Sequence, residues 1–257
     1  MSRFSAAQKP SASQTRDRRA FVLRRLHSFT GVFPVGIFLL LHFIINAKAL
    51  QGRQVFEETS SSLTQIPYLL VLEVFGIWLP LSFHALYGIK LGFEGRPNVG
   101  QYPYSRNWAY TLQRLTGLLV LAFIAYHLWQ FKIQVLLGRL DQTDLFPELC
   151  ARLSATTSGG IPLNAVIYLI GIAAAVFHLT NGLYGFCFSW GITLSRRATR
   201  LASAAFGLFG LCLFVLGANT VIYFATGSRL LLSVDGHPHA GPPPVGCEKL
   251  AAGISVH

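Results

Sequence analysis

Five long apolar segments dominate the chain, at about residues 26–47, 66–92, 110–131, 161–190 and 201–226. A helix rises 1.5 Å per residue, so roughly 20 apolar residues cross the hydrocarbon core of a bilayer, about 30 Å thick. Each segment is long enough, and the absence of water there leaves helices and closed barrels as the only spanning structures. The alternating pattern of a barrel strand is missing. The pattern predicts an all-α membrane protein with five transmembrane helices.

Polar stretches flank and interrupt this membrane domain, which we expect to cover residues 21–230. Residues 1–20 are polar and basic, and residues 231–257 are rich in proline and glycine, so we expect a disordered N-terminus and a flexible tail. Segment 138–160, rich in Ser, Thr and Gly, is expected to be a long outer loop. The first apolar segment has full length and no small-residue cleavage site after it, unlike a signal peptide.

Composition and charge agree with a membrane protein and give it an orientation. The chain is 52% hydrophobic and 12% charged, with a net charge of +11. Basic residues crowd the N-terminal stretch and the second–third and fourth–fifth connections, whereas the other two connections mix acidic and basic residues. The positive-inside rule therefore predicts a cytoplasmic N-terminus and an outer C-terminus in the cell's inner membrane. The charge is a topology signal and does not indicate nucleic-acid binding. The basic residues of those three stretches are Arg3, Lys9, Arg16, Arg18, Arg19, Arg24, Arg25, Lys90, Arg96, Arg106, Arg196, Arg197 and Arg200.

Four of the apolar segments each contain one deep histidine: His42, His84, His127 and His178. Ionisable side chains in hydrocarbon are costly, so four of them point to a shared task. Counting from the segment midpoints places His42 about 7 Å toward the outside, with His127 at a similar height. The second and fourth segments run inward, which puts His84 and His178 in the cytoplasmic half. The sequence thus predicts two layers of two histidines.

Haem is the best candidate for that task. Iron with two axial imidazoles is closed to oxygen and suits electron transfer, and helix bundles hold such cofactors between facing helices. We expect helices I–IV to form a four-helix bundle around two haems, the outer on His42 and His127 and the inner on His84 and His178. A lone membrane histidine is more often a packing residue or proton relay, but two depth-matched pairs favour ligation. The four cysteines are scattered without CxxC or CxxCH, so the haems would be noncovalent and of the b type.

Four other residues are weaker candidates. His27 is a rival ligand on the first helix, but it lies at the cytoplasmic interface without a partner at equal depth on the third, so we interpret it as interfacial. Glu73 is the one carboxylate within the apolar segments and precedes His84 by eleven residues, about 16 Å nearer the outside on the same face. It is either a proton donor to a quinone or a hydrogen-bonded helix-end residue. Arg106 and Arg114 either pair with haem propionates or mark the interface.

Several motifs around the histidines resemble one family over about residues 21–200. That family is the cytochrome b558 subunit of succinate dehydrogenase. The motifs are Arg24-Arg25-Leu26-His27-Ser28, the run from Gly31 to Phe38, Leu79-Pro80-Leu81, His84-Ala85-Leu86-Tyr87-Gly88, Gly100-Gln101-Tyr102, Arg106-Asn107-Trp108, Leu112-Gln113-Arg114-Leu115-Thr116-Gly117, His127-Leu128-Trp129, and the stretch from His178 through Asn181-Gly182-Leu183 to Trp190-Gly191-Ile192-Thr193.

The resemblance implies a single-chain, five-helix, two-haem anchor of a succinate:quinone oxidoreductase or fumarate reductase. It further implies a flavoprotein and an iron–sulfur subunit on the cytoplasmic face, and a quinone, commonly menaquinone, as electron partner. The family's axial ligands fall on His42, His84, His127 and His178. Succinate chemistry belongs to a partner, because this chain has no dinucleotide or flavin glycine motif. The carboxylate that some di-haem fumarate reductases carry beside the fourth-helix ligand is missing from Ala173 to Phe177.

Two other functions stay open. The cytochrome b of a quinone-linked hydrogenase or formate dehydrogenase also pairs histidines across helices. A haem-free transporter or proton channel could use the histidines as relays.

Overall fold

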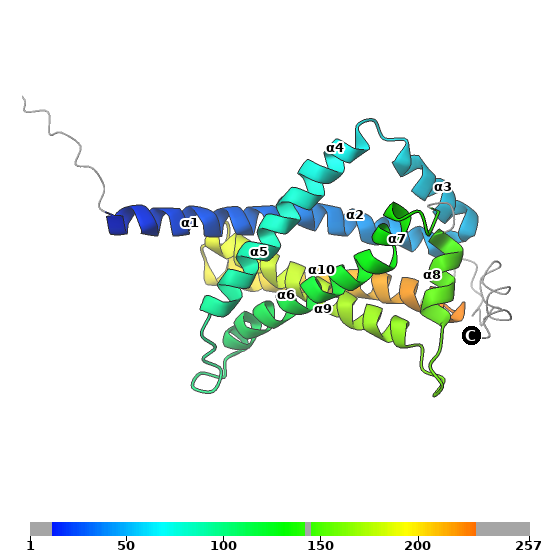
Figure 1. Ribbon diagram of the computed structural model, residues 1–257. Coiled ribbons are helices and arrows are strands. Elements are labelled where there is room, and N and C mark those ends of the chain that lie inside the picture. Colours follow the sequence, from blue (N-terminus) through cyan, green and yellow to red (C-terminus); the bar gives the residue numbers. More distant parts are fainter. Residues whose placement is uncertain (1–11, 142–144, 230–257) are drawn as a thin grey trace, which may run out of the picture.

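The computed structural model describes residues 12–141 and 145–229, and all regular secondary structure within them is helical (Figure 1). Five helices in this part of the chain are long and apolar enough to cross a membrane, which confirms the predicted all-α membrane fold. These spans are Ser13–Gln51, Leu69–Glu94, Ser105–Leu136, Leu163–Ser189 and Arg196–Thr226.

The first span begins earlier than predicted. It consists of α1 (Ala12–Thr30), η1 (Gly31–Val35), α2 (Gly36–Ala47) and η2 (Lys48–Gln51). Residues 12–20 are helical, so the boundary predicted at residue 20 is too late. Ala, Gln and Arg in this stretch are good helix formers, and the polar composition concealed their propensity. The rest of the predicted disordered N-terminus and the predicted tail at 231–257 lie outside the described residues.

The first two spans each contain a π-helical segment beside a proline. In the first span η1 includes Pro34, and in the second η3 (Val74–Trp78) precedes Pro80. Proline cannot donate a backbone hydrogen bond and its ring clashes with the preceding turn of an α-helix. A wider π turn accommodates both effects without ending the helix.

The second span diverges from the bundle toward one end. It is built from α4 (Leu69–Glu73), η3 and α5 (Leu79–Glu94), and α5 packs against α1 and α6 while α4 leans away (Figure 1). The third, fourth and fifth spans pack side by side, with α9 (Leu163–Ser189) in contact with both α6 (Ser105–Gln130) and α10 (Arg196–Thr226).

Small residues allow the close approach of α10. A Cβ at Gly217 would lie 2.6 Å from Cε1 of Phe43 on α2, and one at Gly210 would lie 2.9 Å from Cγ2 of Thr180 on α9. Small residues at helix crossings are typical of membrane bundles, where packing replaces the hydrophobic effect as the driving force. Large apolar side chains such as Leu41, Leu86 and Leu208 are exposed on the outside of the bundle, as expected for a surface in contact with lipid.

One end of the bundle, which we term the capped end, is covered by α3 (Arg53–Thr64) and α8 (Leu145–Ser154), with the short α7 (Lys132–Leu136) beside them (Figure 1). Helix α8 lies within segment 138–160, so the prediction of a plain loop there is wrong. Its Phe146, Cys150 and Leu153 follow helical spacing and are buried with Phe56 and Phe224. Burial of this apolar face stabilises the helix despite the polar residues around it.

Candidate functional site

The structure brings the four deep histidines together in the two pairs predicted. The ring centres of His42 on α2 and His127 on α6 are 5.7 Å apart. Those of His84 on α5 and His178 on α9 are 6.1 Å apart. The first pair lies nearer the capped end. Tyr168, which contacts His127, precedes His178 by ten residues on α9, so the layers are separated by about 15 Å.

The spacing within each pair fits two ligands on opposite sides of one metal. Metal–imidazole bonds are about 2 Å long and the ring centre lies about 1 Å beyond the nitrogen, so opposed imidazoles have centres roughly 6 Å apart. The ring planes are nearly perpendicular, at 81° and 85°. Two rings that share one axis through the metal can adopt this angle.

His27 occupies a different position from the four. Its ring stacks on that of His84, with centres 4.1 Å apart and planes 6° apart. The nitrogen lone pairs of an imidazole lie in the ring plane, so two stacked rings cannot ligate a metal between them. Of its two neighbours His27 and His178, His84 can therefore share a metal only with His178.

Hydrogen bonds at Nδ1 leave Nε2 as the free nitrogen of three of the histidines. Nδ1 of His84 lies 3.0 Å from the backbone oxygen of His27, and Nδ1 of His178 lies 3.1 Å from that of Gln113. Nδ1 of His127 lies 3.1 Å from the hydroxyl of Tyr168. A carbonyl oxygen only accepts, so at least the first two rings carry a proton on Nδ1 and a lone pair on Nε2. Metal-ligating histidines characteristically have this arrangement. His42 differs, since its Nε2 lies 3.3 Å from the amide nitrogen of Asn46.

Two glycines make room for the imidazole rings of His84 and His178. A Cβ at Gly31 would lie 2.3 Å from Cε1 of His84, and one at Gly117 would lie 3.0 Å from Cε1 of His178. Gly31 also opens the π segment η1, which contacts α5. Glycine at these positions therefore permits a helix backbone to lie directly against an imidazole.

Arg114 lies beside the layer formed by His84 and His178, and one of its guanidinium nitrogens has no hydrogen-bond partner among the described residues. It follows Gln113, which bonds to His178, and its Nη1 donates to the backbone oxygen of Tyr110. Its buried Nε has no hydrogen-bond partner among the described residues, and neither has Nη1 of Arg25 at the same end. A Cβ at Gly95 would lie 2.0 Å from that Nε. Arg114 is thus available to an anionic group such as a carboxylate. The guanidinium groups of both arginines also lie over tyrosine rings, Arg114 over Tyr110 and Arg106 over Tyr184, each 3.4 Å from the ring centre.

Glu73 is paired with a residue that sequence reasoning missed. Both of its carboxylate oxygens accept hydrogen bonds of 3.1 Å from Nζ of Lys132. Lys132 lies five residues beyond His127, about 7 Å farther toward the capped end. Glu73 therefore lies on the capped-end side of the layer formed by His42 and His127. The ion pair is partly buried, with side chains 23% and 31% exposed.

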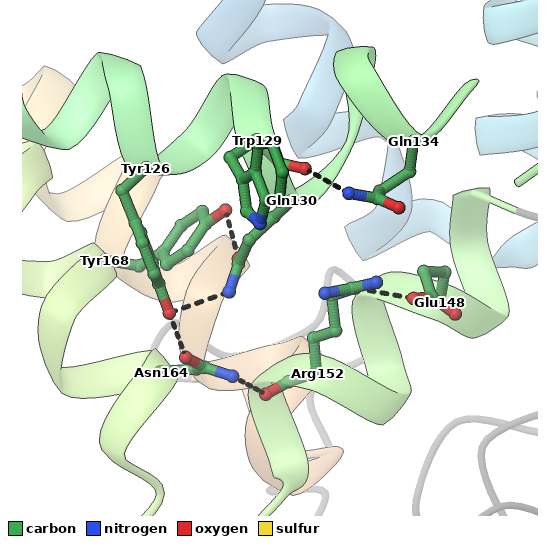
Figure 2. A network of polar contacts seen from close by, with 8 residues as sticks. All are labelled: Tyr126, Trp129, Gln130, Gln134, Glu148, Arg152, Asn164 and Tyr168. Carbon is green, nitrogen blue, oxygen red and sulfur yellow. Dashed lines mark hydrogen bonds and ion pairs between the residues drawn. The ribbon is translucent and has the colours of Figure 1, made fainter. Parts of the chain in front are cut away.

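A network of polar side chains begins at Tyr168, whose hydroxyl contacts His127, and extends away from that histidine. Figure 2 shows this network from Tyr168 onward. The Tyr168 hydroxyl donates to Oε1 of Gln130 at 3.0 Å, and Nε2 of Gln130 donates to the hydroxyl of Tyr126 at 2.7 Å. Tyr126 in turn donates to Asn164, whose Nδ2 donates to the backbone oxygen of Arg152 at 2.9 Å. These residues come from α6, α8 and α9. A search for paired polar residues at equal depth, as applied to the histidines, could have found Tyr168 and Gln130.

Comparisons with known proteins agree with this architecture. The family model described as succinate dehydrogenase/fumarate reductase transmembrane subunit matches residues 95–218. The succinate dehydrogenase cytochrome b558 subunit of Bacillus subtilis is 34% identical over 206 residues, which cover 80% of this chain and 98% of that protein. The succinate dehydrogenase hydrophobic membrane anchor subunit of Halobacterium salinarum is 36% identical over 98 residues, 38% of this chain and 72% of that protein. No solved structure matches the chain. With five apolar spans and a near full-length relative, the chain belongs to the family of multi-pass succinate dehydrogenase cytochrome b558 subunits.

Proposed function

We propose that this chain anchors a succinate:quinone oxidoreductase in the inner membrane and carries electrons from its iron–sulfur subunit to quinone through two b haems. The observation that carries the proposal is that the four deep histidines form two pairs, with ring centres 5.7 Å apart in one pair and 6.1 Å apart in the other. The name of the Bacillus relative, a cytochrome, implies a b haem in that protein and supports the same cofactor here.

Two haems would be held by these residues, one by His42 and His127 and the other by His84 and His178. When bound, bis-imidazole haems supply one-electron carriers that are closed to oxygen. The chain's own part is to leave Nε2 of His84, His127 and His178 free through their Nδ1 bonds, and to keep water from both layers with the apolar side chains of α2, α5, α6 and α9. Arg114 is placed to neutralise a propionate of the haem in the His84–His178 layer.

The proposed orientation has the capped end outside and the opposite end in the cytoplasm. At that opposite end the basic residues form the docking surface for the iron–sulfur subunit, with the flavoprotein beyond it. This surface lies near the His84–His178 layer, because Arg24 and Arg25 precede His27, which stacks on His84. The haem nearest a soluble electron donor would then be the inner one. The docking surface includes Arg24, Arg25, Arg96, Arg106, Arg196, Arg197 and Arg200.

We propose that quinone is reduced near the outer layer, and that this quinone is menaquinone, as the family resemblance implies. Quinone reduction consumes two protons with two electrons, so it needs proton-carrying groups beside the last carrier. Glu73 and Lys132 place a carboxylate next to an ammonium at this end, within about two turns of His127.

A reduced-minus-oxidised spectrum of the purified chain tests the proposal first, and a b-type alpha band is expected. Exchange of His42 or His127 for alanine should remove one haem and leave most of the other, whereas exchange of His84 or His178 should remove the second. The His27→Ala variant is the control and should retain both haems. A chain without any alpha band would rule out both redox functions and favour a transporter.

Copurification separates the two redox functions. The proposal requires a flavoprotein to copurify and succinate to reduce the haems. Reduction by hydrogen or formate through another partner would instead identify a cytochrome b of a hydrogenase or formate dehydrogenase.

A further inference from the structure

An uninterrupted chain of hydrogen bonds links His127 to the capped end, and Figure 2 shows the part of it from Tyr168 to Arg152. It runs from Nδ1 of His127 through Tyr168, Gln130, Tyr126 and Asn164 to the backbone oxygen of Arg152. Tyr168 and Gln130 are each only 6% exposed, so the part nearest the histidine is shielded from solvent. In such surroundings hydrogen bonds are electrostatically strong and polarise one another.

The far end of the chain fixes the direction of every bond in it. The backbone oxygen of Arg152 can only accept, so Asn164 must turn its NH₂ group toward it and its oxygen toward Tyr126. The Tyr126 hydroxyl donates its one proton to Asn164, so it must accept the hydrogen bond from the NH₂ group of Gln130. The Gln130 oxygen then faces Tyr168 and accepts its proton.

The direction of these hydrogen bonds also determines which nitrogen of His127 carries the proton. Because the hydroxyl proton of Tyr168 goes to Gln130, the bond of 3.1 Å between Tyr168 and His127 must have Nδ1 of His127 as the donor. His127 is thus held with its proton on Nδ1 and its lone pair on Nε2. Every dipole in the chain points the same way, which draws the Nδ1 proton toward Tyr168 and makes the imidazole a stronger electron donor at Nε2.

The chain is a poor route for protons. Gln130 and Asn164 accept through an amide oxygen and donate through an amide nitrogen, so a proton could pass only if the amide changed to its imidic acid form. A fixed polarisation is the effect that such a chain can have at neutral pH.

We propose that Tyr168 is a positioning residue that, with Gln130 and Tyr126 behind it, holds the ligand tautomer of His127 and lowers the midpoint potential of the outer haem. The inference rests on the proposed function, since it concerns the haem bound by His127. A more strongly donating imidazole stabilises ferric over ferrous iron, and this lowers the potential. In the inner layer the acceptors at Nδ1 of His84 and His178 are backbone oxygens. The amide nitrogen of Gln113, 3.3 Å from Nδ1 of His178, is a donor and cannot serve as such an acceptor.

The test is a potentiometric titration of both haems in the purified complex, with the outer haem identified as the one lost in His127→Ala. Tyr168→Phe removes the acceptor at Nδ1 and should shift the outer haem to a more positive potential, with the inner haem unchanged. Tyr126→Phe leaves the Tyr168–His127 bond in place but cuts the chain behind Gln130, so it should give a smaller shift of the same sign. The low-spin electron paramagnetic resonance signal of the outer haem should move in parallel.

Tyr223→Phe is the matched control. Tyr223 is 7% exposed at the same end of the bundle, but it lies on α10 and takes no part in the hydrogen-bonded chain from His127. Equal potentials in Tyr168→Phe, Tyr126→Phe and this control would overturn the inference while the two-haem function stood. If Tyr168→Phe loses the outer haem altogether, the shift in Tyr126→Phe decides, and no shift there overturns the inference. A wild-type complex without haem would instead defeat the proposed function itself.

Discussion

At the scale of single residues, the four deep histidines are held by different kinds of neighbour. His84 and His178 bond to backbone oxygens, which no substitution of a side chain removes directly. His127 bonds to the side chain of Tyr168, and His42 contacts that of Asn46. Substitutions can therefore adjust the surroundings of the layer near the capped end more readily than those of the other layer. Different haem potentials in the two layers are the expected consequence.

The pair of Glu73 and Lys132 gives a prediction at the same scale. Glu73→Gln keeps the shape of the side chain but removes its charge and its capacity to carry a proton. A positioned acid or base contributes about 10²- to 10⁴-fold to a proton-transfer step, so quinone reduction should slow by about 10²-fold or more. Both haems should remain bound and reducible by succinate. The measurement is the steady-state rate of succinate:quinone reductase activity beside the rate of haem reduction.

The control for this prediction is Glu57→Gln, which neutralises a carboxylate on α3 at the same end, where Glu57 pairs with Arg53 at 2.6 Å. It should leave both rates unchanged. Normal quinone reduction in Glu73→Gln would contradict the outer quinone site. The alternative place is then a cavity of about 420 Å³ between α9 and α10, lined by residues that include Asn181. Asn181 bonds to Gln113 and so lies near the inner layer.

At the scale of elements, the cap formed by α3 and α8 closes the bundle on the side of the layer formed by His42 and His127. Phe146 of α8 is fully buried between Phe56 of α3 and Phe224 of α10, with ring centres 5.7 and 5.3 Å away. The same helix supplies the Arg152 oxygen that ends the hydrogen-bonded chain from His127. Packing of α8 therefore supports both the closure of the bundle and the polar network.

Phe146→Ala should destabilise this cap. Deletion of a buried phenylalanine ring typically costs about 3–5 kcal/mol of unfolding free energy, so a clear fall in the unfolding temperature is expected. Thermal unfolding in detergent, followed by circular dichroism, measures it. Phe188→Ala removes a ring that is 63% exposed on α9 and serves as the control. Equal unfolding temperatures for the two variants would show that the cap contributes little to stability.

At the scale of the whole molecule, under the proposed function, the orientation in the membrane decides which layer receives electrons from the iron–sulfur subunit. We expect the connection between α5 and α6 in the cytoplasm and the one between α8 and α9 outside. Cysteines introduced at the exposed Asn98 and Ser158 should then react with a membrane-impermeant thiol reagent in intact spheroplasts only at position 158. The parent chain with its native cysteines gives the background. Labelling at position 98 alone would invert the order of the haems and move the docking surface to the capped end.

The sequence by itself determined the five spans and the heights of the histidines along them. Apolar length and helical rise are local properties, so counting residues along each segment was enough to place His42 level with His127 and His84 level with His178. Local composition misled only where a short amphipathic helix was surrounded by polar residues, as in α8, and where a polar helix preceded a span, as in α1.

Only the tertiary structure decided what lies beside each residue at a given height. Lys132 meets Glu73 across 59 positions of sequence, Gly31 lies against His84, and Tyr168 accepts from His127. These contacts depend on how each helix is rotated about its axis and where it crosses its neighbours. Rotation and crossing are set by the packing of small and large side chains from several helices at once, which no single segment encodes.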